Sequence, residues 1–433
     1  MATENSESSP DAPRNLAELR AQRIEKLNEW RAAGHEPYGS ALSDVVSTGD
    51  AVARFEAAGE EEEQEATATI AGRLTAVRTM GKSIFADVKD EQGRLQIYVK
   101  RNILGDENFA WFRALDIGDI VAVTGPVFRT RMGEITLKVQ EFRLLSKSLR
   151  PLPEKWHGLT DVEQRYRQRY LDLIMNDDVR RVFCQRSQLV REIRRFLDDQ
   201  GFMEVETPMM QPIPGGAAAR PFETYYAALD SPMYLRIAPE LFLKRLLVGG
   251  FERVYEINRN FRNEGLSRRH NPEFTMLEVY QAYSDCEGMM ALMESLISTV
   301  TQGVFGTLSI PFGDETIDFS PPWRRVPYTE LVKEHMGEDW YEIPLEAQRK
   351  RAAERGLQIP QDKDSVHATH EVYEKIIERT LIQPTFVTRV PAALVPLAKK
   401  CTDDPDLVDV FELEIGGQEI APGVVDIERL HRA

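Results

Sequence analysis

Two strand-like runs on either side of a charged, glycine-broken loop constrain the fold of this chain more than any other feature. Glu252, Val254, Glu256 and Asn258 alternate with Arg253, Tyr255 and Ile257, and a second run follows in which Phe274, Met276, Glu278 and Tyr280 alternate with Thr275, Leu277 and Val279. A period of two residues predicts strands with one face in a core and the other lining a cleft. Asn263-Glu264-Gly265 breaks the first run. The sequence therefore predicts a hairpin with a polar loop.

The stretch from Phe261 to Tyr280, FRNEGLSRRHNPEFTMLEVY, is rich in arginine and glutamate. The planar guanidinium of Arg262 suits a phosphate, because it donates two parallel hydrogen bonds and keeps its charge. Glu264 would hold that arginine or contact a base. These residue types predict a site for a polyanion. Taken alone, they are more often found in an ordinary hairpin with a salt-bridged, solvent-facing surface.

The segments FRNEG and RHNPEFT resemble motif 2 of the class II aminoacyl-tRNA synthetases, and of the lysyl members in particular. Gly201 to Phe222 (GFMEVETPMMQPIPGGAAARPF) is similar to motif 1 and its following loop. Ala238 to Gly250 (APELFLKRLLVGG) resembles the segment that carries a substrate-contacting glutamate. The resemblance runs from about Ala66 to Glu419. Aspartyl or asparaginyl specificity is disfavoured by RHNPEFT and by the glutamates of the expected lysine site.

The resemblance implies an α+β multidomain chain, with an N-terminal OB-fold β-barrel followed by a class II synthetase antiparallel sheet flanked by helices. Alternation of residue types predicts the barrel independently, as five strands with a helix near 108–115 between the third and the fourth. The predicted strands are Thr67 to Val77, Ser83 to Val88, Leu95 to Val99, Ile120 to Phe128 and Glu134 to Leu145.

Composition shifts along the chain predict its division into segments. The N-terminus is polar and no apolar run reaches membrane-spanning length, so we expect a cytoplasmic protein that is not in a membrane. The expected segments are a disordered tail (1–13), a helical segment with an acidic linker (14–65), an OB-fold anticodon-binding domain (66–148), a connector (149–176) and a catalytic domain (177–433).

The formal net charge of −16 argues against nonspecific nucleic-acid binding, so tRNA contacts must be local. The resemblance implies that Arg78, Phe85 and Gln96 contact the anticodon of lysine tRNA. An aromatic ring offers a stacking surface to an unpaired base, and an amide or guanidinium can bond the edge of the base. Alternation alone fits Phe85 equally well as barrel core.

A lysine substrate demands carboxylates, because burying its ammonium without a counter-charge is costly. The resemblance implies Glu240 and Glu278 as these groups, with Tyr280 beside the ammonium and the backbone of Gly216 closing the pocket. Arg262, the expected catalytic residue, would contact both the lysine carboxylate and the ATP α-phosphate. Two acids and a tyrosine also suit an arginine-like or diamino substrate.

The resemblance also implies ATP as co-substrate, bound by Arg262, Glu264, His270, Asn271 and Phe274. Phe274 would stack on adenine, and His270 would contact a phosphate or the ribose. Adenylation and transfer need no protein nucleophile. Catalysis would come from positioning and from neutralisation of the developing negative charge.

Mg²⁺ is the implied metal, with Glu412 and Glu419 as hard oxygen donors across a Gly416-Gly417 turn. A homodimer is implied through motif 1, expected as a helix from 181 to 200 and a strand ending at residue 208.

The resemblance departs after Ala421, where the family continues through a Gly-aromatic-Ser-Glu-Leu-Asn run. This chain reads PGVVDIERL from Pro422 to Leu430, with Asp426 in place of a substrate-contacting glutamate. We therefore expect a member truncated before motif 3. Two functions stay open: a lysine-tRNA ligase, and a non-catalytic RNA-binding or regulatory protein that keeps the barrel.

Overall fold

The computed structural model describes residues 11–39, 41–59, 67–153, 159–265, 267 and 270–425. The chain forms two compact units, Met1–Arg180 and Arg181–Ala433, and each is described by itself. Most of the predicted tail and the acidic linker lie outside the described residues. Residues 11–13 of the predicted tail are the start of a helix, α1.

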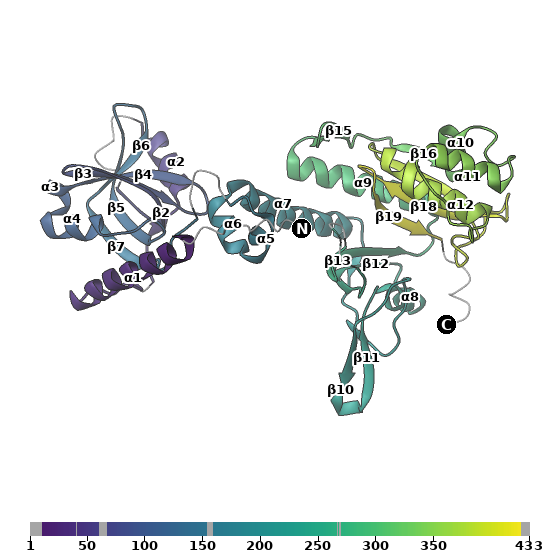
Figure 1. The fold of residues 1–433 in the computed structure, drawn as a ribbon, viewed down its shortest axis with the longest axis horizontal. Helices are drawn as coiled ribbons and strands as arrows, with labels where there is room; N and C mark the ends of the chain where they lie inside the picture. Colours follow the sequence, from purple (N-terminus) through teal and green to yellow (C-terminus); the bar gives the residue numbers. More distant parts are fainter. Residues whose placement is uncertain are drawn as a thin grey trace, which may run out of the picture. The chain divides into compact units, whose positions relative to one another are not determined.

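A closed barrel forms the centre of the first unit (Figure 1). The sheet order is β1-β2-β3-β4-β6-β5-β7, and the additional pairing of β2 with β5 closes it. Its strands are β1 (Val45–Val46), β2 (Thr67–Met80), β3 (Ser83–Lys89), β4 (Arg94–Lys100), β5 (Ile120–Arg129), β6 (Ile135–Val139) and β7 (Glu141–Ser146). The predicted OB-fold barrel is confirmed.

The helices of this unit come before, within and after the barrel. The helix predicted near 108–115 is observed at Asp106–Arg113, and Gly105, with φ 85°, separates it from a short helix at Arg101–Leu104. The helices are α1 (Asp11–Ala32), α2 (Thr48–Ala58), α3 (Arg101–Leu104), α4 (Asp106–Arg113), α5 (Val162–Arg167), α6 (Arg169–Met175) and α7 (Asp177–Asp199), the last running into the second unit.

The single strand predicted from Glu134 to Leu145 was wrong. It is two strands, since β5 pairs with β7 along its first half and with β6 along its second half. At the changeover, a Cβ on Gly125 would lie 1.8 Å from the carbonyl oxygen of Lys138. Only glycine permits this close approach between the strands.

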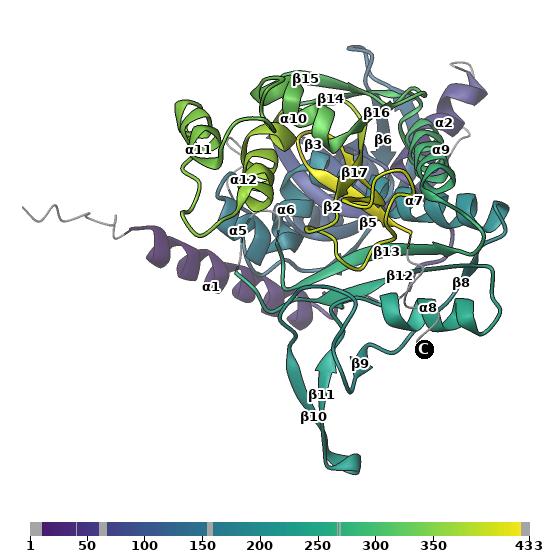
Figure 2. The same ribbon diagram turned by 90° about the vertical axis from the view of Figure 1, so that its right-hand side faces the viewer.

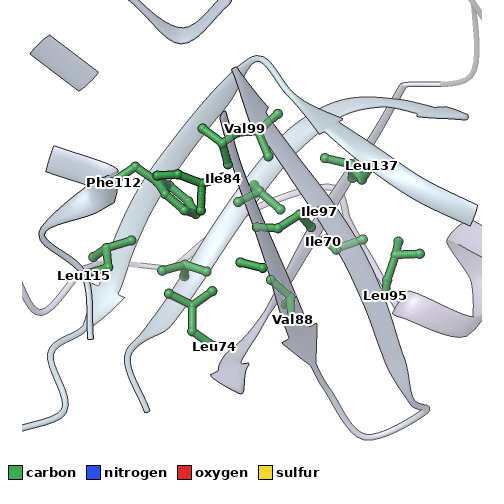
Figure 3. Close-up of a cluster of buried hydrophobic side chains, with 14 of the residues drawn as sticks. Ile70, Leu74, Ile84, Val88, Leu95, Ile97, Val99, Phe112, Leu115 and Leu137 are labelled. Carbon is green, nitrogen blue, oxygen red and sulfur yellow. The ribbon is translucent and has the colours of Figure 1, made fainter. Parts of the chain in front are cut away.

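Apolar side chains from the barrel strands and α4 fill the core of the first unit. Figure 3 shows Ile84, Ile97 and Val99 pointing to the same interior as Phe112 of α4. All four are fully or almost fully buried. Burial of each large apolar side chain stabilises the folded state by about 1.5–3 kcal/mol. This stabilisation from the inner face of the strands allows their outer face to carry polar groups.

The second unit contains several small sheets in place of one continuous sheet. Two of the pairings, β8 with β12 and β16 with β17, are parallel within the otherwise antiparallel arrangement. The sheets have the orders β10-β11-β9, β13-β12-β8, β14-β15 and β16-β17-β18-β19. The strand expected to end at Pro208 is shorter, since β8 covers only Met203–Glu204.

The remaining elements follow in chain order. The strands are β9 (Met210–Gln211), β10 (Glu223–Tyr226), β11 (Ser231–Leu235), β12 (Arg253–Phe261), β13 (Glu273–Gln281), β14 (Ser309–Phe312), β15 (Glu315–Asp318), β16 (Arg324–Pro327), β17 (Thr385–Pro391), β18 (Leu407–Glu414) and β19 (Glu419–Val424). The helices are η2 (Ala227–Leu229), α8 (Glu240–Val248), α9 (Cys286–Phe305), α10 (Tyr328–Met336), α11 (Leu345–Glu354), α12 (Ser365–Val372), η3 (Tyr373–Ile377) and η4 (Glu378–Thr380).

The predicted hairpin is confirmed as β12 and β13, and its two faces differ. On one face, Tyr255, Leu277 and Val279 pack against Leu197 and Phe202, at the end of α7 and just after it. The other face carries Glu256, Asn258 and Glu278. Figure 2 shows β12 and β13 beside α8, with β10 and β11 extending away from them. Among the described residues, no helix has the length and apolar character needed to cross a membrane.

Candidate functional site

A pocket opens beside the loop that joins β12 to β13. Arg262, Glu264, His270, Asn271 and Phe274, the candidate ATP contacts, all line it, together with Gly265 and Pro272. The strand ends bring these residues together because Phe261 pairs with Glu273 at the mouth of the hairpin. The structure thus places the whole predicted group around one cavity, while its role stays a prediction.

A backbone hydrogen bond and contact with an aromatic ring hold Arg262 at the edge of this pocket. Its amide nitrogen donates to the carbonyl of Pro272 at 2.9 Å, and its guanidinium carbon lies 5.3 Å from the centre of the Phe274 ring. The Nε atom is buried and has no hydrogen-bond partner among the described residues. Leaving a buried donor unpaired costs about 1–3 kcal/mol, so the site favours an added acceptor such as an anion.

His270 lies at the exposed rim of the pocket. Its Nδ1 and the hydroxyl of Ser267 are 2.8 Å apart, and the same hydroxyl accepts from the His270 amide at 3.1 Å. Ser267 therefore orients the ring and engages Nδ1. This geometry fits a histidine that contacts a ligand through its other nitrogen better than one that abstracts a proton.

The candidate lysine residues meet on the polar face of the hairpin. Gly216 has φ +89°, and a Cβ there would lie 2.9 Å from Cβ of Glu240. The hydroxyl of Tyr280 donates to Oε2 of Glu278 at 2.9 Å. Glu240 also accepts from Lys244 at 2.8 Å, a contact that sequence reasoning did not predict. The structure brings these carboxylates into one electrostatic neighbourhood.

Burial, followed by the charges of Glu240 and Glu256, raises the pKa of Glu278 to about 7. The Tyr280 hydroxyl and the Arg236 guanidinium act in the opposite direction. A carboxyl that titrates near neutrality is one that needs a cation to remain ionised at little cost. The site therefore offers an acceptor for an ammonium group.

A second acidic group lies at the end of the β18–β19 hairpin. Burial raises the pKa of Glu412 to about 7, with Glu419 adding to the rise. The pKa of Glu419 is also raised, chiefly by desolvation and then by Glu378 and Glu374, while the charge of Arg262 opposes the rise. Arg262 thus links this group electrostatically to the β12–β13 loop.

Glu414 joins these acids, and sequence reasoning missed it. It accepts from the Tyr373 hydroxyl at 2.9 Å, and burial raises its pKa to about 8. Its spacing of two residues from Glu412, on the same strand face, was the available signal. Mutual repulsion among buried carboxylates favours a bound cation.

Glu412 and Glu419 fit Mg²⁺ in the way this ion is usually held. Mg²⁺ keeps several waters and binds one or two carboxylates together with substrate phosphates, in place of a complete protein cage. The described part of the chain contains no group of three or more His, Cys, Asp or Glu side chains arranged to hold a metal by itself.

In the barrel, Arg78, Phe85 and Gln96 lie on one outer surface. Arg78 pairs with Phe85 across β2 and β3, and its guanidinium donates to the Gln96 side-chain oxygen at 3.2 Å. The alternative of Phe85 as barrel core is wrong, because Ile84 and Ala86 point inward and leave Phe85 half-buried on the outside. The three residues are placed to act together.

This surface extends further than the sequence suggested. Phe85 and Tyr98 have ring centres 4.8 Å apart, and Phe128 follows at 6.4 Å from Tyr98. The ammonium of Lys138 lies 5.0 Å from the centre of the Phe128 ring. Three aromatic rings with a cation at the end form a stacking surface suited to single-stranded bases.

Two family models match different parts of the chain. The model of the class II tRNA synthetases (D, K and N) matches residues 161–433, and the model of the OB-fold nucleic acid binding domain matches residues 68–145. The chain is 52% identical to the lysine–tRNA ligase of Pelotomaculum thermopropionicum over 410 residues, which cover 94% of the chain and 80% of that relative. It is 47% identical to the lysine–tRNA ligase of Bacillus subtilis over 408 residues, covering 94% of the chain and 82% of that relative.

Proposed function

Because the chain belongs to the lysine–tRNA ligases of the class II tRNA synthetases, we propose that it activates L-lysine with ATP and transfers it to the 3′ end of lysine tRNA. The lysine carboxylate attacks the ATP α-phosphate, which forms lysyl-adenylate and releases pyrophosphate. A ribose hydroxyl of the tRNA then attacks the adenylate carbonyl and releases AMP. In both steps the protein positions the reactants and neutralises charge.

The observation that carries this proposal is the buried Nε of Arg262 beside the pocket, which has no hydrogen-bond partner in the part of the chain that the structure describes. Arg262 binds the α-phosphate and the lysine carboxylate, which places the attacking oxygen beside phosphorus. Phe274 stacks on the adenine, while Glu264, His270 and Asn271 hold the rest of the nucleotide. Arg262 also stabilises the charge that accumulates during the displacement.

Glu240 and Glu278 bind the side-chain ammonium of lysine, and the Tyr280 hydroxyl orients Glu278. Gly216 leaves room for the ligand beside Glu240. Glu412 and Glu419 would hold Mg²⁺, which supplies positive charge to the ATP phosphates when it is bound.

Arg78, Phe85 and Gln96 contact the anticodon of lysine tRNA on the outer surface of the barrel. A planar ring flanked by a guanidinium and an amide supports this role, since it can both stack on a base and bond the edge of that base. We place the reaction in the cytoplasm, where tRNA is charged.

The protein acts as a homodimer through the motif 1 helix. Val182 and Phe183 of α7 are adjacent and are 58% and 50% exposed, and this apolar pair supports burial of the helix against a second copy. Sedimentation analysis tests this assignment, since a monomer at micromolar concentration would contradict it.

Lysine-dependent ATP–pyrophosphate exchange tests the proposed reaction. Lysine should stimulate exchange, whereas arginine and ornithine should not. Arg262→Ala should lose at least ~30-fold in kcat/KM, or ~2 kcal/mol of transition-state stabilisation. Arg259→Ala is the matched control, because Arg259 is an exposed arginine of β12, the strand that ends just before Arg262, and its charge pairs with Glu273 at 3.4 Å.

Absence of lysine-dependent exchange, combined with retained binding of lysine tRNA, would favour the alternative of a non-catalytic RNA-binding or regulatory protein. An Arg262→Ala rate equal to that of Arg259→Ala would remove Arg262 from the catalytic role.

A further inference from the structure

A fully buried ion pair lies behind the carboxylates proposed for lysine. Nη1 of Arg236 is 2.7 Å from Oε1 of Glu256, and the two side chains are 0% and 1% exposed. Arg236 lies four residues before Glu240, at the approach to α8, whereas Glu256 lies on β12. Removing one partner of a buried pair leaves the charge of the other uncompensated. That charge then acts on the ionisable groups nearby.

Neutral groups fix the geometry of the pair from several sides. Nε of Arg236 donates to the carbonyl of Arg259 at 2.9 Å, and Nη1 also donates to the hydroxyl of Thr207 at 3.0 Å. The Thr207 hydroxyl donates to the second carboxylate oxygen of Glu256 at 2.7 Å. The guanidinium bonds the carbonyl through Nε and the carboxylate through Nη1, two donors held in a fixed planar fork.

Glu256 is the direct cross-strand neighbour of Glu278. The two residues are paired in the β12–β13 register, so their side chains leave the same face of the sheet. Like charges directly opposite each other on antiparallel strands are destabilising. The groups that face Glu278 are Glu256 on β12, Glu240 on α8, the Tyr280 hydroxyl on β13 and the Arg236 guanidinium. Arg236 is the cation of this set.

We propose that Arg236 is a positioning residue for lysine recognition, which cancels the charge of Glu256 and thereby keeps Glu278 ionised to accept the substrate ammonium. This inference rests on the proposed function, because it assigns Glu278 to lysine. Arg236 does not contact the substrate. It acts through Glu256, and the buried pair determines the charge of Glu278 without reaching the substrate.

The protonation state of Glu278 depends on the Arg236–Glu256 pair, because opposing effects act on the pKa of Glu278. The pKa of Glu278 is raised to about 7 by burial, Glu240 and Glu256 even though Arg236, the cation among the groups that act on it, opposes the rise. Without Arg236, the Glu256 charge would act on Glu278 uncompensated, and Glu278 would be protonated at neutral pH. A protonated carboxyl is a much weaker partner for an ammonium group.

Three variants test whether Arg236 affects lysine binding through its charge or through its packing. Arg236→Met removes the cation and keeps most of the volume, Glu256→Gln removes the anion, and the double variant removes both and leaves the net charge unchanged. Lysine binding is measured by isothermal titration from about pH 6 to about pH 8.5, and far-UV circular dichroism checks the fold of each variant.

In Arg236→Met, lysine affinity at neutral pH should fall about 5-fold and return as the pH rises, because the midpoint of its pH profile moves upward by about one unit from about 7. In Glu256→Gln the midpoint should move to lower pH. The double variant should return the midpoint to near its wild-type value.

An equal loss of affinity at every pH in Arg236→Met, not restored in the double variant, would overturn the inference and leave a packing role. If Arg236→Met does not fold, Glu256→Gln decides, and an unchanged midpoint in that variant would overturn the inference as well. Wild-type protein that binds no lysine at any pH would instead overturn the proposed function on which the inference rests.

Discussion

The ammonium of Lys244 lies 2.8 Å from Oε1 of Glu240, one turn earlier in α8. The protein therefore places one of its own ammonium groups on a carboxylate that we assign to the ammonium of the substrate. Both side chains are largely shielded, with 19% and 23% exposure. Bound lysine must share Glu240 with Lys244 or displace it.

Removal of this internal ammonium should strengthen lysine binding. We expect Lys244→Met to lower the KM for lysine by about 2- to 5-fold with little change in kcat, since partly exposed ion pairs within a helix contribute about 0.2–1 kcal/mol. Lys333→Met is the control, because it removes a similar helical pair with Glu330 at 3.1 Å. A higher KM in Lys244→Met would mean that Lys244 holds Glu240 in its binding position.

The ionised form of Glu278 should destabilise the protein. Its pKa is raised to about 7 in the folded chain, from 4.5 for an unperturbed carboxyl. The folded state therefore binds this proton more tightly, and the resulting stability is complete below about pH 4.5 and lost as the pH rises through about 7.

Glu278→Gln should accordingly unfold less readily than wild type at about pH 8, by about 1–3 kcal/mol, and equally readily at about pH 5. It should also lose lysine binding. Thermal melts at the two pH values measure the difference, with Glu252→Gln, an exposed position just before β12, as the control. A Glu278→Gln variant less stable than wild type at the higher pH would contradict the assigned burial cost.

Local patterns predicted the hairpin well and its surroundings poorly. Alternation along residues 252–280 sufficed for β12 and β13, because a strand face is decided by neighbours two residues apart. The ion pair of Arg236 and Glu256 joins an approach to a helix with a strand, and no local pattern encodes it. Lys244 was overlooked for a different reason: its spacing from Glu240 is visible, but a helical ion pair is ordinarily a surface feature.

In the barrel, alternation could not decide the position of Phe85. Both faces of β3 carry apolar residues, with Ile84 and Val88 inside and Phe85 outside. The division of the fifth predicted strand was equally hidden, because it depends on β5 having two partners along its length. Packing sets the register between strands that are distant in sequence, and a local residue pattern does not contain this information.

The orientation of the Gln96 amide should depend on Thr136. The Gln96 side-chain nitrogen donates to the Thr136 hydroxyl at 2.9 Å, while its oxygen accepts from Arg78 at 3.2 Å. Thr136→Val keeps the shape and removes the acceptor. We expect KM for lysine tRNA to rise about 2- to 10-fold, the range for one neutral hydrogen bond, while lysine-dependent exchange is unchanged.

Thr124→Val serves as the control for this variant, because it removes the hydroxyl that lies 2.9 Å from the Thr69 hydroxyl elsewhere in the barrel. Equal effects of the two variants on tRNA charging would show that barrel stability, and not the amide of Gln96, is responsible.

Gly216 should be required for its lack of a side chain and not only for its backbone angle. It adopts φ +89°, and an added Cβ would meet Cβ of Glu240 at 2.9 Å and Cβ of Ala238 at 3.2 Å. Gly250 has a similar φ of +102°, but a Cβ there would meet nothing within 4 Å. Both alanine variants should lose about 1–2 kcal/mol of stability to backbone strain.

Only Gly216→Ala should also weaken lysine binding, by about 10-fold or more, because its new methyl group must push the carboxylate of Glu240 out of place. Calorimetric titration with lysine, together with thermal melts of both variants, separates the two effects. If Gly250→Ala weakens binding as much as Gly216→Ala, strain transmitted along the chain explains the loss. The contact between Gly216 and Glu240 would then have no part in recognition, since the open position would matter as much as the crowded one.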